Sequence, residues 1–271
     1  MLPRALLDQY DVQPKKSLGQ NFLHDSSALD RVVAAVRLLP GETVLEIGPG
    51  TGALTVKLAA IAGQVVTVEI DERLIPILDV TLHDYPNVRL VHADILDTDV
   101  GTLMGNVPYC VAANLPYYIT SAILRHLLEA PRKPSRLALT VQEEVAERIV
   151  APAGDWSVLA VSVHFYGKPQ IVSHIGASSF WPRPNVSSAI LRVEVYPTPP
   201  VSVSSDAAFF RVVRAGFGQK RKQLKNSLSA GLRCAPAQGE DYLRQAGIDP
   251  MRRAETLTLE EWAALSRAVE P

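Results

Sequence analysis

Glycines and acidic residues stand where the first three predicted strands end. The stretch VLEIGPGTGALT carries Gly48, Gly50 and Gly52 between an apolar run and a helical one. Glycines there allow a tight turn and let a ligand lie against bare backbone. Glu69 follows Gly52 by 17 residues at the end of the second run, and Asp94 ends the third. An acid after the second strand can accept hydrogen bonds from both hydroxyls of a ribose, so the pattern predicts a nucleoside site. The alternative is that the glycines form only an ordinary strand-to-helix turn.

The loop itself indicates which nucleoside. A pyrophosphate-binding loop normally reads G-x-G-x-x-G, whereas this one reads G-P-G-T-G and is preceded by Glu46. A carboxylate beside the loop repels phosphates and favours a cation. S-adenosylmethionine combines a ribose and an adenine with a sulfonium and an ammonium, and it has no phosphate. We therefore expect S-adenosylmethionine as the cofactor in preference to NAD.

The stretch ANLPYYIT, residues 113–120, follows the fourth predicted strand. An exocyclic amine of a base is a poor nucleophile, because its lone pair is delocalised into the ring. The Asn114 amide oxygen and a backbone carbonyl of Leu115 or Pro116 can accept its two N–H groups and aim the lone pair at a methyl donor. Tyr117 can stack on the base. The alternative is a strand that simply ends in a proline turn, and the glycine loop 66 residues before Asn114 argues against it.

A basic segment lies near the C-terminal end. Residues 207–233 contain seven Lys and Arg and no acid, although the whole chain has a net charge of −1. Such a cluster fits the phosphates of a nucleic acid, while the alternative is a basic face that is merely solvated. The residues expected to bind RNA surround the Gly218-Gln219 turn and are Arg211, Arg214, Lys220, Arg221, Lys222 and Lys225.

The elements that must position these groups alternate between strands and helices. The predicted strands are 43–48, 64–70, 88–94, 109–115 and 136–142, and amphipathic helices are predicted at 26–38, 53–62, 72–82 and 120–130. Strands that are apolar throughout and separated by helices indicate a parallel sheet covered on both faces. Three more predicted strands, 158–167, 171–177 and 187–196, complete the same sheet. The fold class is therefore α/β, with a Rossmann-like sheet.

The stretch PTPPVSVSSD, residues 197–206, breaks this pattern, and helical spacing follows it. We predict a methyltransferase domain over 1–197 and a small all-α RNA-binding domain over 198–271.

Composition limits the remaining possibilities. Hydrophobic residues make up 47% of the chain, which suffices for a sizeable core. The two cysteines, Cys110 and Cys234, and the six His lack metal-ligand spacing, so we expect no metal. The N-terminal MLPRALLDQY lacks the apolar core of a signal peptide, and no apolar run is long enough to span a membrane. We expect a cytoplasmic monomer.

Four stretches together resemble the ribosomal RNA adenine dimethyltransferases: SLGQNFL at 17–23, LEIGPGTGALT at 45–55, NLPY at 114–117 and VQEEVAERI at 141–149. The resemblance covers nearly the whole chain. It is greatest for the bacterial enzymes that dimethylate two adjacent adenines near the 3′ end of small-subunit rRNA during ribosome biogenesis. It implies that Asn21 and Leu23 line the cofactor pocket, that Asp94 lies at the adenine, and that Phe180 of FWPRPNVSSA stacks on the flipped base opposite Tyr117.

Two other functions remain open. The first is that of the related enzymes that methylate one adenine of large-subunit RNA, which share the cofactor site but usually read N-I-P-Y where this chain has Leu115. The second is a non-catalytic assembly or transcription factor on the same fold. Glu69, Asp94 and the NLPY stretch argue against the latter, because binding without turnover would not need them.

Overall fold

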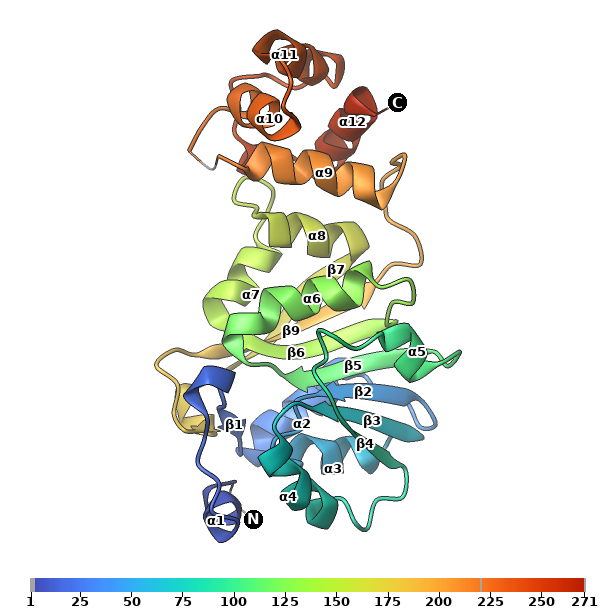
Figure 1. The fold of residues 1–271 in the computed structure, drawn as a ribbon, viewed down its shortest axis with the longest axis vertical. Coiled ribbons are helices and arrows are strands. Elements are labelled where there is room, and N and C mark those ends of the chain that lie inside the picture. Colours follow the sequence, from blue (N-terminus) through green and yellow to red (C-terminus); the bar gives the residue numbers. More distant parts are fainter. Residues whose placement is uncertain (1–2, 220, 271) are drawn as a thin grey trace. The chain divides into compact units, whose positions relative to one another are not determined.

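The computed structural model describes residues 3–219 and 221–270. The chain forms two compact units (Figure 1). The first consists of Met1–Ala146 and Pro169–Val195, and the second of Glu147–Lys168 and Tyr196–Pro271. The second unit thus includes a segment that precedes the proline-rich break, in addition to the predicted C-terminal helices.

The first unit is built on a seven-stranded sheet. Its strands are β2 (Thr43–Ile47), β3 (Gln64–Glu69), β4 (Val88–His92), β5 (Tyr109–Asn114), β6 (Arg136–Gln142), β7 (Gly167–Ile175) and β9 (Ser188–Val195). They lie in the order β4-β3-β2-β5-β6-β9-β7; neighbouring strands from β4 to β6 pair in parallel, and β9 pairs with β6 antiparallel. The chain winds from β2 outward to β4 and then returns to β5 on the other side of β2. The carboxyl ends of β2 and β5 therefore meet where an open α/β sheet binds its ligand.

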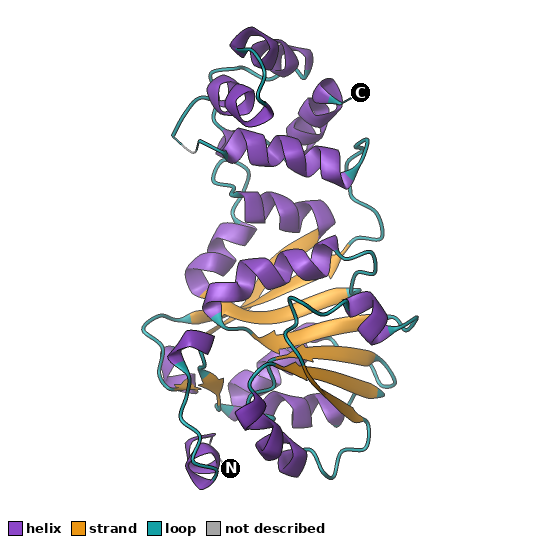
Figure 2. Cartoon of the chain, viewed as in Figure 1, coloured by secondary structure: helices purple, strands orange, loops and turns teal. Residues whose placement is uncertain are grey.

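Both faces of this sheet are covered, as the apolar strands predict. Every residue of β2 is buried. On one face α2 (Ser26–Val36) and α3 (Ala53–Ala59) pack against Val44, Val65 and Cys110. On the other face lies α6 (Thr120–Glu129), whose residues Ile123, Leu124, Leu127 and Leu128 are all fully buried. Figure 2 draws the helices in purple. The helices and short 3₁₀ turns of this unit are α1 (Pro3–Gln9), η1 (Lys16–Leu18), α2 (Ser26–Val36), α3 (Ala53–Ala59), η2 (Glu72–Leu74), α4 (Ile75–Thr81), α5 (Val100–Met104), η3 (Tyr117–Ile119), α6 (Thr120–Glu129) and η4 (Ala177–Ser179). The residues of α7 (Glu143–Val150) belong partly to this unit and partly to the second.

A small second sheet joins two distant parts of the chain. β1 (Phe22–Leu23) pairs antiparallel with β8 (Phe180–Trp181), so that Leu23 lies opposite Phe180. The segment before it is anchored by α1, whose Leu7 packs with Phe22 against Leu74 and Leu78. The N-terminal segment is therefore fastened beside the strand ends.

One predicted strand is a helix. Residues Val158–Tyr166 form α8, capped by the Ser157 hydroxyl, which accepts a hydrogen bond from the Ala160 N–H at 3.2 Å. Short runs that are apolar throughout fit a buried helix as well as a buried strand, because they have no periodicity to separate the two. The rings of Phe165 and Phe209 stack with centroids 4.5 Å apart, which places α8 in the core of the second unit. The other two predicted late strands, β7 and β9, do complete the sheet.

The rest of the second unit is helical, as predicted. Its elements are α9 (Asp206–Phe217), α10 (Leu224–Leu232), α11 (Pro236–Gln245), η5 (Ala254–Thr256) and α12 (Leu259–Val269). Trp262 of α12 is fully buried and stacks on Phe217 with centroids 5.5 Å apart. Close packing requires a glycine here, since a Cβ on Gly216 would lie 2.5 Å from the Trp262 ring.

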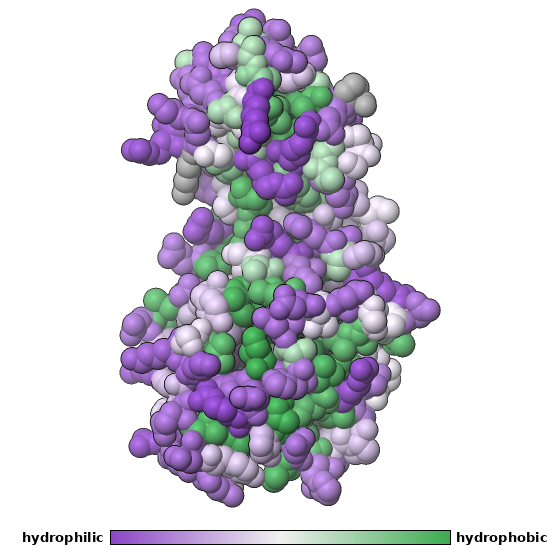
Figure 3. Space-filling view, viewed as in Figure 1, coloured by the Kyte–Doolittle hydropathy of each residue, from purple (hydrophilic) through white to green (hydrophobic). Residues whose placement is uncertain are grey.

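The surface is mixed in character. On the face shown in Figure 3, hydrophilic residues predominate and apolar residues appear in smaller groups between them. Among the described helices, none combines the length and the apolar character needed to cross a lipid bilayer.

Candidate functional site

A cavity of about 350 Å³ lies in the first unit at the carboxyl ends of β2, β3, β4 and β5. Its volume is within the usual range for small-molecule sites. The walls come from segments that are far apart in the sequence, namely 18–23, 46–51, 68–70, 93–96, 114–119 and Phe180. All the residues that the sequence assigned to catalysis or cofactor binding line this one cavity: Asn21, Leu23, Gly48, Gly50, Glu69, Asp94, Asn114, Leu115, Pro116, Tyr117 and Phe180.

The glycine loop forms one wall. Gly48 and Gly50 have φ angles of 68° and 61°, in the left-handed region that favours glycine. A Cβ on Gly50 would lie 2.9 Å from the Phe22 ring. Gly50 therefore serves both the turn and the close approach of the N-terminal segment, and Phe22 is a wall residue that the sequence reasoning did not single out.

Glu69 is held in place by backbone donors at the end of β3. The residue is 4% exposed; its Oε1 accepts the Asp71 N–H at 2.9 Å and its Oε2 accepts the Gly50 N–H at 3.2 Å. Burial raises the pKa of Glu69, and these two hydrogen bonds lower it. Each carboxylate oxygen keeps a further lone pair, so Glu69 can accept two hydroxyl groups from a ligand in the cavity.

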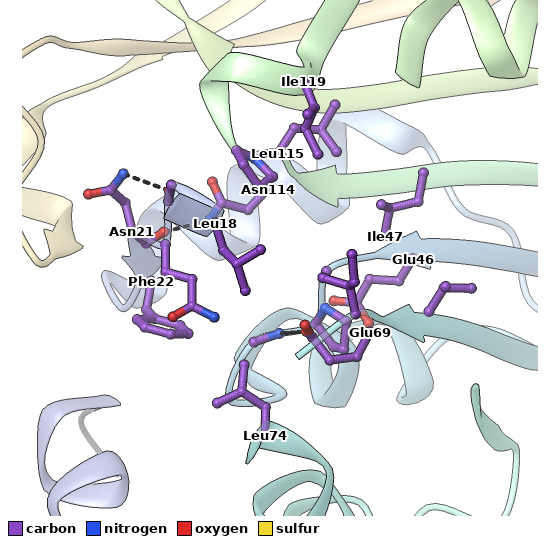
Figure 4. Close-up of a pocket in the computed structure, with 18 of the residues that line it drawn as sticks. Leu18, Asn21, Phe22, Glu46, Ile47, Glu69, Leu74, Asn114, Leu115 and Ile119 are labelled. Carbon is purple, nitrogen blue, oxygen red and sulfur yellow. Dashed lines mark hydrogen bonds between the residues drawn. The ribbon is translucent and has the colours of Figure 1, made fainter. Parts of the chain in front are cut away.

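Glu46 lies beside Glu69 on the neighbouring strand (Figure 4). It is 1% exposed, and within the described part of the chain neither carboxylate oxygen has a hydrogen-bond partner. Burial raises the pKa of Glu46 to about 7; the Thr55 and Thr67 hydroxyls oppose this shift, and the Glu69 carboxylate adds to it. Both of these hydroxyls also lack a partner in hydrogen-bonding geometry among the described residues, so they offset little of the burial cost. An unsatisfied buried carboxylate on the cavity wall favours a positively charged ligand.

Asn114 is oriented by the N-terminal segment. Its Nδ2 donates to the backbone carbonyl of Asn21 at 2.9 Å, and the Asn21 side chain in turn donates to the Gly19 carbonyl at 3.0 Å (Figure 4). The two ends of an amide are told apart by their partners, and a carbonyl can only accept. This hydrogen bond therefore assigns the amide nitrogen of Asn114 and leaves its oxygen available to a ligand.

The two aromatic residues predicted to hold a base lie on the cavity wall in different ways. Tyr117 is half-buried, and its hydroxyl lies 2.8 Å from the Ser188 Oγ of β9. Phe180 is only 3% exposed and packs among core residues that include Leu23 and Leu29. The geometry thus fixes the Tyr117 ring by its hydroxyl and the Phe180 ring by core packing.

A polar network behind the cavity was missed by the sequence reasoning. Asp71 is buried and accepts from the Arg73 Nε and Nη2 at 2.8 and 2.6 Å and from the Gln20 Nε2 at 2.7 Å. Arg73 also donates to the Gln13 carbonyl at 3.3 Å. The Arg73 guanidinium holds the pKa of Asp71 below its usual range. The network ties the segment from Gln13 to Gln20 to the end of β3, and the only sequence signal was an acid two residues after Glu69.

The predicted RNA-binding residues gather in the second unit, apart from Lys220, which lies outside the described residues. Arg214, Arg221 and Lys222 are exposed, and Lys225 is half-buried on α10. Arg211 is also exposed but forms an ion pair with Glu270. Among the described members of this cluster, Arg214, Arg221 and Lys222 are therefore the ones that are exposed and are not held in the ion pair with Glu270.

A metal centre has no counterpart in the described residues. No group of three or more His, Cys, Asp or Glu among them could hold an ion. Cys110 is buried in β5, and burial raises the pKa of its thiol to about 11, which disfavours a role as a nucleophile.

Comparison with known proteins points to one family. The family described as "Ribosomal RNA adenine dimethylase" matches residues 12–270. The "Ribosomal RNA small subunit methyltransferase A" of Dehalococcoides mccartyi is 46% identical over 97% of this chain and 90% of its own length. Among solved structures, the 23S rRNA methyltransferase ErmE is 31% identical with a TM-score of 0.72 and covers 93% of this chain and 100% of its own. A dimethyladenosine transferase from Plasmodium falciparum is 25% identical with a TM-score of 0.74 and covers 90% and 95%.

The buried Glu46 carboxylate, which has no hydrogen-bond partner among the described residues, leads to a prediction about pH. Its pKa of about 7 in the folded chain is above the usual range, so the folded chain holds this proton more tightly than the unfolded chain. The resulting stabilisation is complete below the usual glutamate pKa and is lost as the pH rises through about 7. In Glu46→Gln, the fall in the free energy of unfolding between pH 5 and pH 8 should shrink by about 3 kcal/mol. Urea titrations without cofactor measure the free energy of unfolding at both pH values, and the exposed Glu129→Gln serves as a control. Equal pH dependence in wild type and Glu46→Gln would contradict the prediction.

Proposed function

The chain belongs to the ribosomal RNA adenine dimethylase family and is an S-adenosylmethionine-dependent rRNA adenine methyltransferase, and we propose that it dimethylates the exocyclic amino groups of two adjacent adenines near the 3′ end of small-subunit rRNA. The observation that carries this proposal is the orientation of Asn114. Its amide nitrogen is engaged by Asn21, so its oxygen faces the same cavity as the two buried carboxylates. The two carboxylates then suit a cation, and the Asn114 oxygen at the end of the strand next to β2 suits an amine that donates hydrogen bonds.

The charges and the hydrogen-bond acceptors of the cavity suit S-adenosylmethionine. Glu69 would accept the two ribose hydroxyls. Asp94 lines the cavity and would face the adenine; among the described residues its Oδ1 accepts the Leu96 N–H at 2.9 Å, and its Oδ2 stays available to a ligand. Glu46 and the glycine loop would take the end that carries the ammonium and the sulfonium, and the positive charge would satisfy a carboxylate that has no partner among the described residues. When bound, the cofactor supplies an activated methyl group.

Two acceptors of this chain would hold the target amine. The Asn114 oxygen is one. The carbonyl of Pro116 already accepts from the Ile119 N–H at 3.3 Å and the Thr120 hydroxyl at 3.4 Å, which favours the Leu115 carbonyl as the other. Together they would draw the lone pair out of the ring plane and aim it along the path of transfer. The amine nitrogen becomes cationic as the new bond forms, so its proton would leave readily to water and a strong base is not needed.

Aromatic side chains would position the base. The hydrogen bond between the Tyr117 and Ser188 hydroxyls anchors the Tyr117 ring at its hydroxyl end, and Phe180 would form the opposite wall. A base that has been extruded from its helix is read by stacking of this kind. The exposed charges of the second unit would bind the phosphates of the RNA. The substrate would be the assembling small subunit, in the cytoplasm, and the chain would act as a monomer.

The 31% identity to ErmE gives a second candidate, methylation of large-subunit rRNA. The discriminating experiment is transfer of radiolabelled methyl groups to unmethylated small subunits and to large subunits in parallel. Label in two adjacent adenines of the small subunit supports the proposal. Label only in the large subunit supports the second candidate, and no label in either supports a role in binding without turnover.

Replacement of Glu69, the carboxylate expected to bind the ribose, should weaken cofactor binding. Glu69→Ala removes a carboxylate that would form two charge-assisted hydrogen bonds, each worth about 1.5–3 kcal/mol. We expect at least a tenfold rise in the dissociation constant for S-adenosylmethionine by calorimetry. The exposed Glu129→Ala serves as the matched control and should bind as wild type does; normal affinity in Glu69→Ala would remove Glu69 from the site.

The amide of Asn114 should matter mainly in the transition state. In Asn114→Ala, the single-turnover rate at saturating cofactor and RNA should fall about 100-fold, the size seen when one preorganised polar group is lost at a developing charge. Asn114→Asp keeps an acceptor oxygen but places a second one against the Asn21 carbonyl, which now receives the Nδ2 hydrogen bond. We expect Asn114→Asp to keep part of the activity and to lose stability. A wild-type rate in the Ala variant would mean that the segment is only a strand-ending turn.

The exposed charges around the α9–α10 turn should control the salt dependence of RNA binding. Arg221→Gln with Lys222→Gln should lower the slope of log affinity against log salt by roughly 0.7–0.9 for each lost phosphate contact. The matched control is Arg244→Gln with Arg253→Gln, which removes two charges of the same unit that are paired with Glu240 and Glu255. Binding to small subunits at several salt concentrations measures both. An equal slope in the test and control variants would show that Arg221 and Lys222 are merely solvated.

A further inference from the structure

We propose that Tyr118, together with Lys15 and Lys16, forms an RNA subsite at the rim of the cavity, where it holds the nucleotide adjacent to the target adenine. This inference rests on the proposed function and adds a second RNA contact, in the first unit, to the basic cluster of the second. It concerns residues that the predicted site did not include.

Tyr118 is an exposed aromatic residue at the mouth of the cavity. It is 62% exposed and lines the cavity directly after the acceptor segment that ends with Tyr117. The two tyrosines belong to η3, and in a 3₁₀ turn with three residues per turn consecutive side chains point in different directions. Tyr117 is tied to Ser188, whereas Tyr118 projects toward solvent. An inner and an outer aromatic residue thus stand in sequence at the acceptor end.

The ring of Tyr118 rests on bare backbone. Gly19 has a φ of 59°, and a Cβ added to it would lie 3.1 and 3.2 Å from the Cδ1 and Cε1 atoms of Tyr118. Gly19 is in turn fixed by its carbonyl, which accepts from the Asn21 side chain, and by its N–H, which donates to the Lys16 carbonyl at 3.0 Å. The ring is therefore supported from below while most of its surface stays open. A supported open ring is what base stacking requires.

The charge of the segment that supports this ring selects the occupant. Lys15 and Lys16 are both exposed, and they enter the tight turn that ends at Gly19. The Lys15 N–H is anchored by the Gln20 Oε1 at 2.7 Å, so the turn holds the two lysines within one turn of the residue that supports Tyr118. Two cations disfavour a cofactor that is itself positively charged and favour a phosphate. A planar base with a phosphate on its backbone satisfies both features, as in binding of single-stranded nucleic acid.

The reaction gives this subsite a role. A target adenine that enters the cavity must leave its helix, and the adjacent nucleotide then loses a stacking partner. Tyr118 would replace that partner and keep the RNA strand at the rim. The subsite would thus contribute to substrate binding rather than to the methyl-transfer step.

The test separates substrate binding from chemistry. With S-adenosylmethionine saturating, KM and kcat for unmethylated small subunits are measured for wild type, Tyr118→Ala, Tyr118→Leu and Tyr118→Phe. Tyr118→Leu keeps apolar bulk over Gly19 but lacks a planar ring. We expect KM to rise about tenfold in the Ala and Leu variants and to stay within about twofold in Phe, because stacking needs the ring and not the hydroxyl. The dissociation constant for S-adenosylmethionine should remain that of wild type in all three.

The lysines are tested by salt dependence. Lys15→Gln with Lys16→Gln should raise KM and lower the salt slope of subunit binding, whereas the control Arg89→Gln with Arg125→Gln, which removes two exposed charges elsewhere in the first unit, should do neither. The inference is overturned if KM is unchanged in Tyr118→Leu, or if cofactor affinity falls as much as KM rises, which would make Tyr118 part of the cofactor site. A wild-type chain that methylates no small subunit would instead overturn the proposed function itself.

Discussion

The hydrogen bond from the Asn114 amide to the Asn21 carbonyl joins two segments that are 93 residues apart in the chain. It uses one of the two N–H donors of the Asn114 amide and fixes which end of that amide faces the Asn21 carbonyl, and so it decides which atom a ligand meets. It forms because the N-terminal segment is anchored on both sides: α1 packs on α4 before it, and β1 pairs with β8 after it. A loose N-terminal segment would leave Asn114 free to rotate, and the acceptor geometry would be lost. The chemistry at the end of β5 therefore depends on packing at the other end of the chain.

The same segment reaches the cofactor end of the cavity. Gln20 donates to Asp71, whose backbone N–H donates to Glu69. Phe22 lies against Gly50, whose N–H also donates to Glu69. Two separate chains of contacts thus run from residues 20–22 to the carboxylate that would bind the ribose. The packing of the N-terminal segment and the orientation of Glu69 therefore depend on the same contacts.

Two buried carboxylates side by side raise the free energy of the folded chain when both are ionised. Glu69 is compensated by two backbone donors, but Glu46 has no such compensation among the described residues. A cationic ligand would remove this cost, so part of the affinity for the cofactor would come from relief of an unfavourable interaction within the protein. This explains why an acid precedes the glycine loop at a position where a phosphate-binding site would avoid one.

Several features of this protein could be read from the sequence because they depend on local pattern. Apolar strands that alternate with amphipathic helices predicted the parallel sheet, and a parallel sheet brings its carboxyl ends to one edge, so the placement of Glu69, Asp94 and Asn114 followed. Asn21 and Leu23 came from the resemblance, since no local rule connects residue 21 to residue 114. Helix α8 was wrongly predicted as a strand, because a short run that is apolar throughout has no period, and only the rings of Phe165 and Phe209 in one core decide it. The orientation of the Asn114 amide, the unsatisfied state of Glu46 and the support of Tyr118 by Gly19 likewise required the tertiary structure. Each is a contact, or the lack of one, between residues far apart in the chain, and a one-dimensional pattern contains no record of it.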